Sequence, residues 1–104
     1  MTDLIKDNIA QLQDLCRRHH VKTMYLIGSA TRSDLFSADS DIDLLYVFNK
    51  PDIPEMDYAD NYFDLLFSLE DLFQRKVDLV PQEKLTNKYF IDSIEKQKEM
   101  IYES

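Results

Sequence analysis

The sequence is poor in the residues that interrupt or cross-link a chain. Its 104 residues include one glycine, three prolines, one cysteine and no tryptophan. The single cysteine, Cys16, cannot form a disulfide within the chain, which is typical of proteins that fold in a reducing compartment. No apolar run approaches the ~20 residues that a membrane-spanning helix requires, and the first residues do not resemble a secretory signal. We therefore expect a cytoplasmic protein without membrane contact.

Basic residues are also scarce, because 12 Lys and Arg stand against 20 Asp and Glu and the net charge is −8 at pH 7. Broad contact with the phosphates of nucleic acid requires a basic face, so direct nucleic-acid binding is not expected. The same charge is compatible with a divalent-cation site and with a basic protein partner. The length predicts one domain, residues 1–104.

The hydrophobic pattern alternates between helical and strand spacing. Helical spacing predicts helices over residues 3–19, 57–73 and 87–102, and strand patterns cover residues 21–27, 41–48 and 76–80. A short helix over residues 29–35 is expected after the turn at Gly28. The middle strand is apolar on both faces beyond its first residues, which is typical of a central strand. The loop of residues 49–55 contains two prolines, and its role is open. The predicted fold is a small α/β domain whose three-stranded, mixed sheet packs with about four helices.

One stretch, residues 27–48, contains most of the residues capable of chemistry. The only glycine, Gly28, is followed by Ser29 at the end of a strand, and Asp41 and Asp43 open the next strand. Residues two apart on a strand face the same way, so these carboxylates need a compensating cation, usually a hard divalent ion. Asp78, inside the last predicted strand, is a third acid that needs a partner. A D-x-D pair beside apolar residues also occurs by chance, and the order of all these features is what favours a site.

An EF-hand is the first alternative, because Asp39, Asp41 and Asp43 have the spacing with which such a loop begins. The loop requires Gly at its sixth position and Glu at its twelfth. Those positions hold Leu44 and Lys50. The sequence therefore excludes an EF-hand calcium loop.

Two motifs resemble a known family. Residues 28–33 read G-S-A-T-R-S and residues 40–44 read S-D-I-D-L. They resemble the signature of the minimal nucleotidyltransferases, the small branch of the DNA polymerase β-like superfamily, which reads G-S-x-A-R-G, a spacer and S-D-x-D-L. Thr31 and Ser33 depart from the alanine and glycine of that signature. The resemblance covers essentially the whole chain and implies the small nucleotidyltransferase fold.

The resemblance also implies two groups of site residues. The carboxylates that would carry catalysis and hold Mg²⁺, as two ions, are Asp41, Asp43 and Asp78. The residues that would bind the nucleotide, with ATP as substrate, are Gly28, Ser29 and Arg32. From the residues alone, Arg32 could equally pair with a carboxylate of the D-x-D strand. Asp78 would complete the second ion position or accept a proton from the acceptor.

Stand-alone members of this family are often antitoxins of HEPN/MNT toxin–antitoxin pairs. The resemblance therefore implies a protein adenylyltransferase that transfers AMP from ATP to a tyrosine of a cognate HEPN ribonuclease toxin. One alternative is an antitoxin that neutralises its toxin by stoichiometric binding. Another is modification of a small molecule, as in aminoglycoside nucleotidyltransferases, which usually carry extra helical segments for the acceptor.

Overall fold

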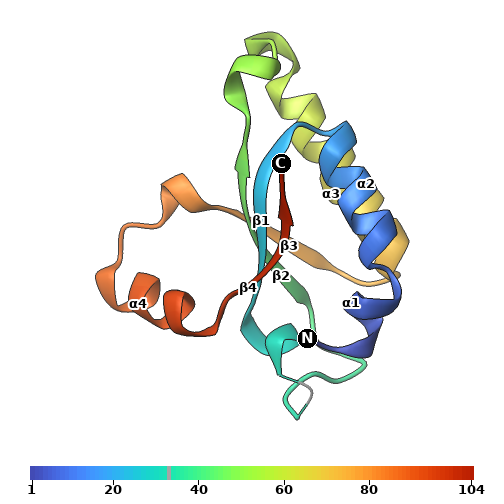
Figure 1. The fold of residues 1–104 in the computed structure, drawn as a ribbon, viewed down its shortest axis with the longest axis vertical. Coiled ribbons are helices and arrows are strands. Elements are labelled where there is room, and N and C mark those ends of the chain that lie inside the picture. The colour runs from blue at the N-terminus through green and yellow to red at the C-terminus, as the bar shows by residue number, and fades with distance from the viewer. Residues whose placement is uncertain (33) are drawn as a thin grey trace.

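A computed structural model describes residues 1–32 and 34–104. Its centre is a four-stranded sheet with the order β3-β2-β1-β4 (Figure 1). The strands are β1 (Val21–Ile27), β2 (Ile42–Phe48), β3 (Val77–Pro81) and β4 (Glu99–Glu103). β1 is antiparallel to both β2 and β4, whereas β2 and β3 are parallel. The predicted mixed sheet is therefore confirmed, with one strand more than expected.

The additional strand lies where the sequence predicted the end of the last helix. Helix α4 (Lys88–Gln97) begins after Asn87, as expected, but it ends well before residue 102. Lys98 is extended, and the following residues form β4 on the outer edge of β1, with Ile101 buried in the core. The open edge of β1 offers backbone hydrogen-bond partners, and this tertiary contact overrides the helical spacing of the local sequence.

One face of the sheet is covered by three helices, which lie together on the same side in Figure 1. They are α1 (Asp3–Asp7), α2 (Ile9–Arg18) and α3 (Tyr58–Phe73). The predicted helix over residues 3–19 is divided at Asn8, whose backbone leaves the helical region and whose side chain donates to the Leu4 carbonyl. The predicted helix over residues 57–73 is confirmed. Side chains from all three helices enter the core, among them Ile5, Leu12, Cys16, Leu65 and Leu69.

The opposite face of the sheet has less cover. Because side chains alternate along a strand, Leu44 points into the large core while Leu45 points to this second face. There it forms a smaller cluster with Ile27 and with Ile94 of α4. α4 lies on the side of the sheet opposite the other helices (Figure 1). Asp43 belongs to the same second face as Leu45, so the candidate carboxylates lie on the less covered side.

Short 3₁₀ turns lie in the connections β1–β2, β2–α3 and β3–α4. The predicted helix over residues 29–35 is instead the turn η1 (Gly28–Thr31). The predicted loop before α3 contains η2 (Lys50–Asp52) and η3 (Glu55–Asp57), with Ile53 buried between them, and η4 (Gln82–Lys84) follows β3. Within the described ranges, no helix has the length and apolar character needed to cross a bilayer.

Candidate functional site

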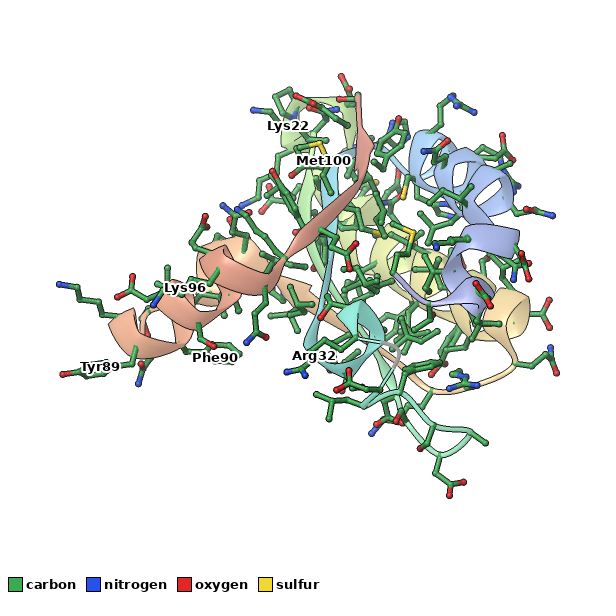
Figure 2. The ribbon with its side chains drawn as sticks, turned by 60° about the horizontal axis from the view of Figure 1, so that its bottom comes forward. Lys22, Arg32, Tyr89, Phe90, Lys96 and Met100 are labelled. Atoms are coloured by element: carbon green, nitrogen blue, oxygen red, sulfur yellow. The ribbon has the colours of Figure 1, made fainter. Side chains whose placement is uncertain are left out.

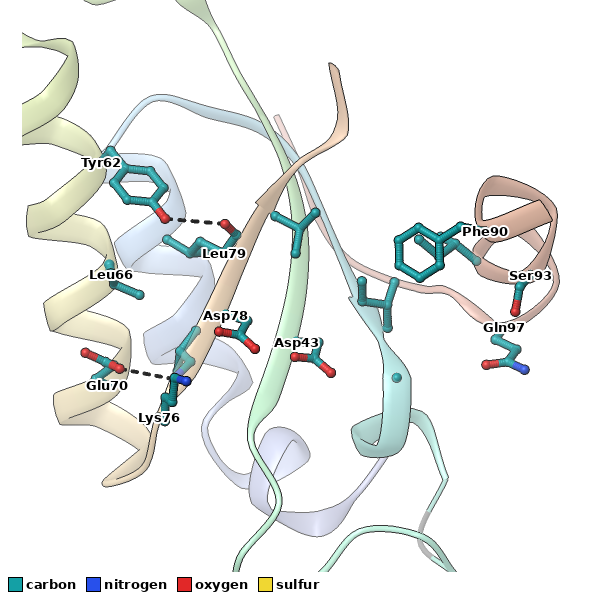
Figure 3. Close-up of a pocket in the computed structure, with 15 residues that line it drawn as sticks. Asp43, Tyr62, Leu66, Glu70, Lys76, Asp78, Leu79, Phe90, Ser93 and Gln97 are labelled. Carbon is teal, nitrogen blue, oxygen red and sulfur yellow. Dashed lines mark hydrogen bonds between the residues drawn. The ribbon is translucent and has the colours of Figure 1, made fainter. Parts of the chain in front are cut away.

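Two acids that are distant in sequence become neighbours on the sheet. The parallel register of β2 and β3 places Asp43 directly opposite Asp78. Side chains at paired positions project from the same face, and Figure 3 shows both carboxylates pointing to the same side. The prediction that Asp78 lies beside the D-x-D strand is therefore confirmed.

The pKa of Asp43 reflects this crowding. It is raised to about 6, first by burial of the carboxyl group and then by the neighbouring Asp78 and by the charge of Asp41. The ammonium group of Lys76 opposes the shift, and its Nζ lies 4.0 Å from Asp41 Oδ2. A raised carboxyl pKa means that ionisation at neutral pH is costly without a compensating cation. Perturbed carboxylates of this kind concentrate at functional sites.

The single glycine lies against the same carboxylate. β1 ends opposite Asp43, because Ile27 pairs with it across the antiparallel ladder. The next residue, Gly28, has a φ of +71°, and a Cβ at this position would lie 2.5 Å from Asp43 Oδ2. Glycine is therefore required here both for the backbone conformation and for the close approach. Thr31 Oγ1 donates to the Gly28 carbonyl at 2.7 Å and closes the turn, so this departure from the family signature stabilises the local structure.

The other predicted nucleotide-binding residues lie close to this turn. Ser29 is in η1 and is half-buried. Arg32 is exposed, and its guanidinium forms two contacts with Asp34, at 2.8 and 3.2 Å. Arg32 therefore pairs with Asp34 and not with a D-x-D carboxylate, while its contact with phosphate stays a prediction. Ser33, the second departure from the signature, lies outside the described residues.

The donor set around Asp43 is compatible with magnesium. Mg²⁺ is usually held by one or two carboxylates together with substrate phosphates and water, and Asp43 with Asp78 supplies such a pair beside an open cavity. Among the residues that the structure describes, no group of three or more His, Cys, Asp and Glu side chains is placed to hold a metal ion. Asp41 directly precedes β2 and is not part of the paired strands. Its role as a third ligand stays a prediction.

A cavity of about 570 Å³ surrounds the carboxylate pair (Figure 3). Its volume is within the range of small-ligand pockets, about 300–1,000 Å³. On the second face it extends from Gly28 and Asp43 to Phe90 of α4, and around β3 it reaches Tyr62 of α3. The lining residues are Ile27, Gly28, Asp43, Tyr62, Leu66, Glu70, Lys76, Val77, Asp78, Leu79, Val80, Phe90, Ser93, Ile94 and Gln97.

Helical spacing places Tyr62 and Phe90 in the apolar stripes of their helices, as it does ordinary core residues. Both line the cavity, and Phe90 is 50% exposed. Helical spacing identifies the face of a helix but not which part of that face a neighbouring strand covers. No signal in the sequence could have separated these two aromatic residues from ordinary core residues.

Helix α3 also protects the outer edge of the sheet. The backbone N–H of Val77 donates to Glu70 Oε2 at 3.2 Å, and the Tyr62 hydroxyl donates to the Leu79 carbonyl at 3.4 Å. Unpaired backbone groups on an edge strand invite the addition of another strand. Side chains of α3 satisfy two such groups of β3, and they hold the strand that carries Asp78.

Comparison with known proteins defines the class to which this fold and site belong. The family model described as "Polymerase beta, Nucleotidyltransferase" matches residues 10–104. The chain therefore belongs to the polymerase β-like nucleotidyltransferase family, and its resemblance to the minimal branch is confirmed.

Two curated relatives come from Methanocaldococcus jannaschii, and both are named "Putative protein adenylyltransferase". One is 28% identical to this chain over 102 residues, and the other is 33% identical over 102 residues. Each alignment covers 90% of this chain and 96% of the relative. These relatives are therefore similar to the chain over almost their whole length.

Solved structures share the fold. A structure described as a "putative minimal nucleotidyltransferase" has a TM-score of 0.73 and 25% identity, with 94% of this chain and 95% of that chain covered. A toxin–antitoxin crystal structure with AMP-PNP has a TM-score of 0.69 and 19% identity, with coverages of 93% and 74%. A complex of tri-AMPylated HEPN toxin and MNT antitoxin from Shewanella oneidensis has a TM-score of 0.63, 18% identity and coverages of 95% and 72%. At these two lower identities the likeness concerns the fold alone.

Proposed function

We propose that this chain is a Mg²⁺-dependent protein adenylyltransferase that transfers AMP from ATP to a tyrosine of a cognate HEPN ribonuclease toxin and thereby acts as an antitoxin. The observation that carries the proposal is the pairing of Asp43 with Asp78 beside the positive-φ Gly28. The names of the two archaeal relatives and of the HEPN–MNT complex support the same reaction and the same kind of partner.

Some of the site residues would bind the metal ions and the others would bind the nucleotide. Bound Mg²⁺, as two ions, would supply charge stabilisation for the attacking and leaving oxygens of an in-line displacement. Asp43 and Asp78, with Asp41 beside them, would hold these ions. The backbone of Gly28 and the side chains of Ser29 and Arg32 would donate hydrogen bonds to the phosphate oxygens.

The proposed transfer is balanced without another reactant. The acceptor tyrosine oxygen attacks the α-phosphorus of ATP, the bond to the β-phosphate oxygen breaks, and pyrophosphate leaves. The hydroxyl proton goes to Asp78 or to water. The products are an O-adenylyl tyrosine and pyrophosphate.

Label transfer tests the proposal. The purified chain is incubated with α-³²P-labelled ATP, Mg²⁺ and the protein product of the adjacent gene, and label on that protein is measured by gel electrophoresis and mass spectrometry. We expect label that requires Mg²⁺ and is lost with Asp43→Asn. Asp39→Asn is the matched control, because Asp39 is an exposed acid in the loop just before the site. Absence of label on protein at every Mg²⁺ concentration would refute the proposal.

The second candidate function is neutralisation of the toxin by stoichiometric binding alone. It is favoured by the lack of a convergent three-ligand group among the described residues and by the departure from the family signature at Ser33. The same variant separates the two functions. If folded Asp43→Asn still neutralises the toxin fully at equimolar amounts, binding without chemistry is the function.

A further inference from the structure

Helix α3 exposes two aromatic residues on its outer face. Phe63 is 49% exposed and Phe67 is 60% exposed. They are four residues apart and therefore neighbours on the helix, and their rings stack with centroids 6.0 Å apart. Phe63 also packs edge-to-face on Tyr62, at 5.1 Å, and Tyr62 is hydrogen-bonded to β3. The exposed pair is therefore held in place before anything binds to it.

The surroundings of this pair are strongly acidic. Residues 51–74 contain seven Asp and Glu but no Lys, Arg or His. Asp60, Asp64 and Asp71 lie on the exposed side of α3 beside the phenylalanines, and within the described ranges none of the three takes part in an ion pair. We call Phe63, Phe67 and these three acids the α3 aromatic surface. Exposed apolar groups rimmed by charge are typical of protein-interaction sites.

The α3 aromatic surface is continuous with the candidate site. Tyr62 and Glu70 of α3 line the cavity that contains Asp43 and Asp78 (Figure 3). Phe67 precedes Glu70 by three residues, and residues three apart are neighbours on a helix. The exposed pair is therefore next to the cavity-lining stripe, so a protein bound there would lie beside the carboxylates.

The charge distribution favours one kind of occupant. A second copy of this chain would bring another net charge of −8 and the same acidic rim, and like charges in contact are unfavourable. An anionic membrane surface is disfavoured for the same reason. Guanidinium and ammonium groups, in contrast, are attracted both to the carboxylates and to the faces of the phenyl rings.

We propose that the α3 aromatic surface binds a partner protein that presents Arg or Lys together with apolar side chains, and that this contact brings the acceptor hydroxyl of the partner to the Asp43–Asp78 cavity. The inference rests on the proposed function for the identity of the partner. Phe63 and Phe67 anchor the contact, and the acids Asp60, Asp64 and Asp71 set its charge complementarity.

The test measures binding separately from chemistry. The protein product of the adjacent gene is titrated into the chain by isothermal titration calorimetry, without ATP, at low and high salt. Phe63→Ser/Phe67→Ser should raise the Kd at least about tenfold, because aromatic anchors dominate interface energies. Asp43→Asn should bind like the wild type. Asp64→Asn/Asp71→Asn should slow association and weaken its dependence on salt.

The matched control is Tyr89→Ser/Met100→Ser. Figure 2 shows Tyr89 on α4 and Met100 on β4, and they are 87% and 46% exposed, so this variant removes exposed apolar groups elsewhere. Unchanged affinity of the Phe63→Ser/Phe67→Ser variant, equal loss in the control variant, or no binding by the wild type would overturn the inference. A homodimer of the wild type in analytical sedimentation that dissociates in the Phe63→Ser/Phe67→Ser variant would also overturn the inference. Binding that is lost in the variant, with no transfer in any protein, would support the docking surface and refute only the transfer reaction.

Discussion

The two faces of the sheet differ in what they bury. The first face packs against α1, α2 and α3, and Leu26 and Leu44 on it are fully buried. The second face packs against α4 and against Leu85 in the segment before it, and it exposes Asp78 and leaves Asp43 half-buried. Neighbouring residues of one strand, Asp43 and Leu44, therefore belong to opposite environments. The comparison teaches that the large core of this small domain and its candidate site lie on opposite sides of the same strands.

Full cover of the second face would abolish the site. Two acids that meet under a helix would lose their hydration, and a buried, unpaired carboxylate is strongly destabilising. The cavity beside Asp43 and Asp78 leaves this carboxylate pair open on one side. The raised pKa of Asp43, to about 6, shows that even this partial burial disfavours its charge.

The largest expected effects come from substituting the neighbouring residues Asp43 and Leu44, which should change activity and stability, respectively. Asp43→Asn should lower the rate of AMP transfer about 10³-fold, the scale of losing one electrostatic stabiliser, without unfolding the protein. Leu44→Ala should lower the free energy of unfolding by about 2–5 kcal/mol, because it leaves a cavity in the core. Transfer rates and urea unfolding curves measure both. If the Leu44 variant, when folded, loses as much activity as the Asp43 variant, the division between the faces is wrong.

Gly28 provides the next largest effect. Gly28→Ala should lower the free energy of unfolding by about 1–2 kcal/mol, because an L-residue is strained at positive φ. It should also lower transfer about a hundredfold, since the new Cβ displaces the Asp43 carboxylate and small displacements at a reacting centre are costly.

Gly28→Asn distinguishes backbone strain at positive φ from displacement of the Asp43 carboxylate. Asparagine tolerates positive φ, but its Cβ would meet Asp43 Oδ2 like that of alanine. Recovery of stability without recovery of activity is the expected result. Full activity in this variant would show that close approach to Asp43 does not matter.

Arg32 tests the outer part of the site. Arg32→Gln should leave the melting temperature unchanged, because exposed ion pairs such as Arg32–Asp34 contribute little to stability. It should raise the KM for ATP about tenfold, the scale of one charge-assisted hydrogen bond. Arg17→Gln is the control, since Arg17 is another exposed arginine paired with an aspartate. An unchanged KM would assign Arg32 a purely structural role.

The smallest effect concerns pH. The pKa of Asp43 is raised from 3.8 to about 6 in the folded protein, so its contribution to stability is fully present below pH 3.8 and is lost as pH rises through 6. A full shift of about two units corresponds to about 3 kcal/mol, and solvent screening of this half-exposed group reduces it to about 1 kcal/mol. In urea unfolding without Mg²⁺, Asp43→Asn should therefore be more stable than the wild type at pH 7.5 by this amount.

The difference between the two proteins should disappear at pH 4, and added Mg²⁺ should stabilise the wild type more than the variant at pH 7.5. An equal response of both proteins to pH and to Mg²⁺ would show that Asp43 is neither crowded nor a ligand.

Sequence patterns predicted the elements with strong periodicity. The strand over residues 21–27 and the helix over residues 57–73 are where apolar spacing placed them. The break at Asn8 and the strand β4 were not predicted. For β4 the deciding contact is the open edge of β1, which exists only after the chain has folded. The break at Asn8 involves a hydrogen bond from its side chain to the Leu4 carbonyl, which apolar spacing does not report.

The candidate site was likewise predictable from the sequence only in part. The order of Gly28, the D-x-D pair and the late Asp78 is written in the sequence, and it was sufficient to indicate the family. Asp43 lies opposite Asp78 because of the register of two parallel strands, which a long helical crossover connects. The packing of that crossover decides how the parallel strands pair. Local residue spacing therefore determined which groups are available for chemistry. Only tertiary packing decided which groups meet, because the contacts between β2, β3 and α3 link segments that are far apart in the chain.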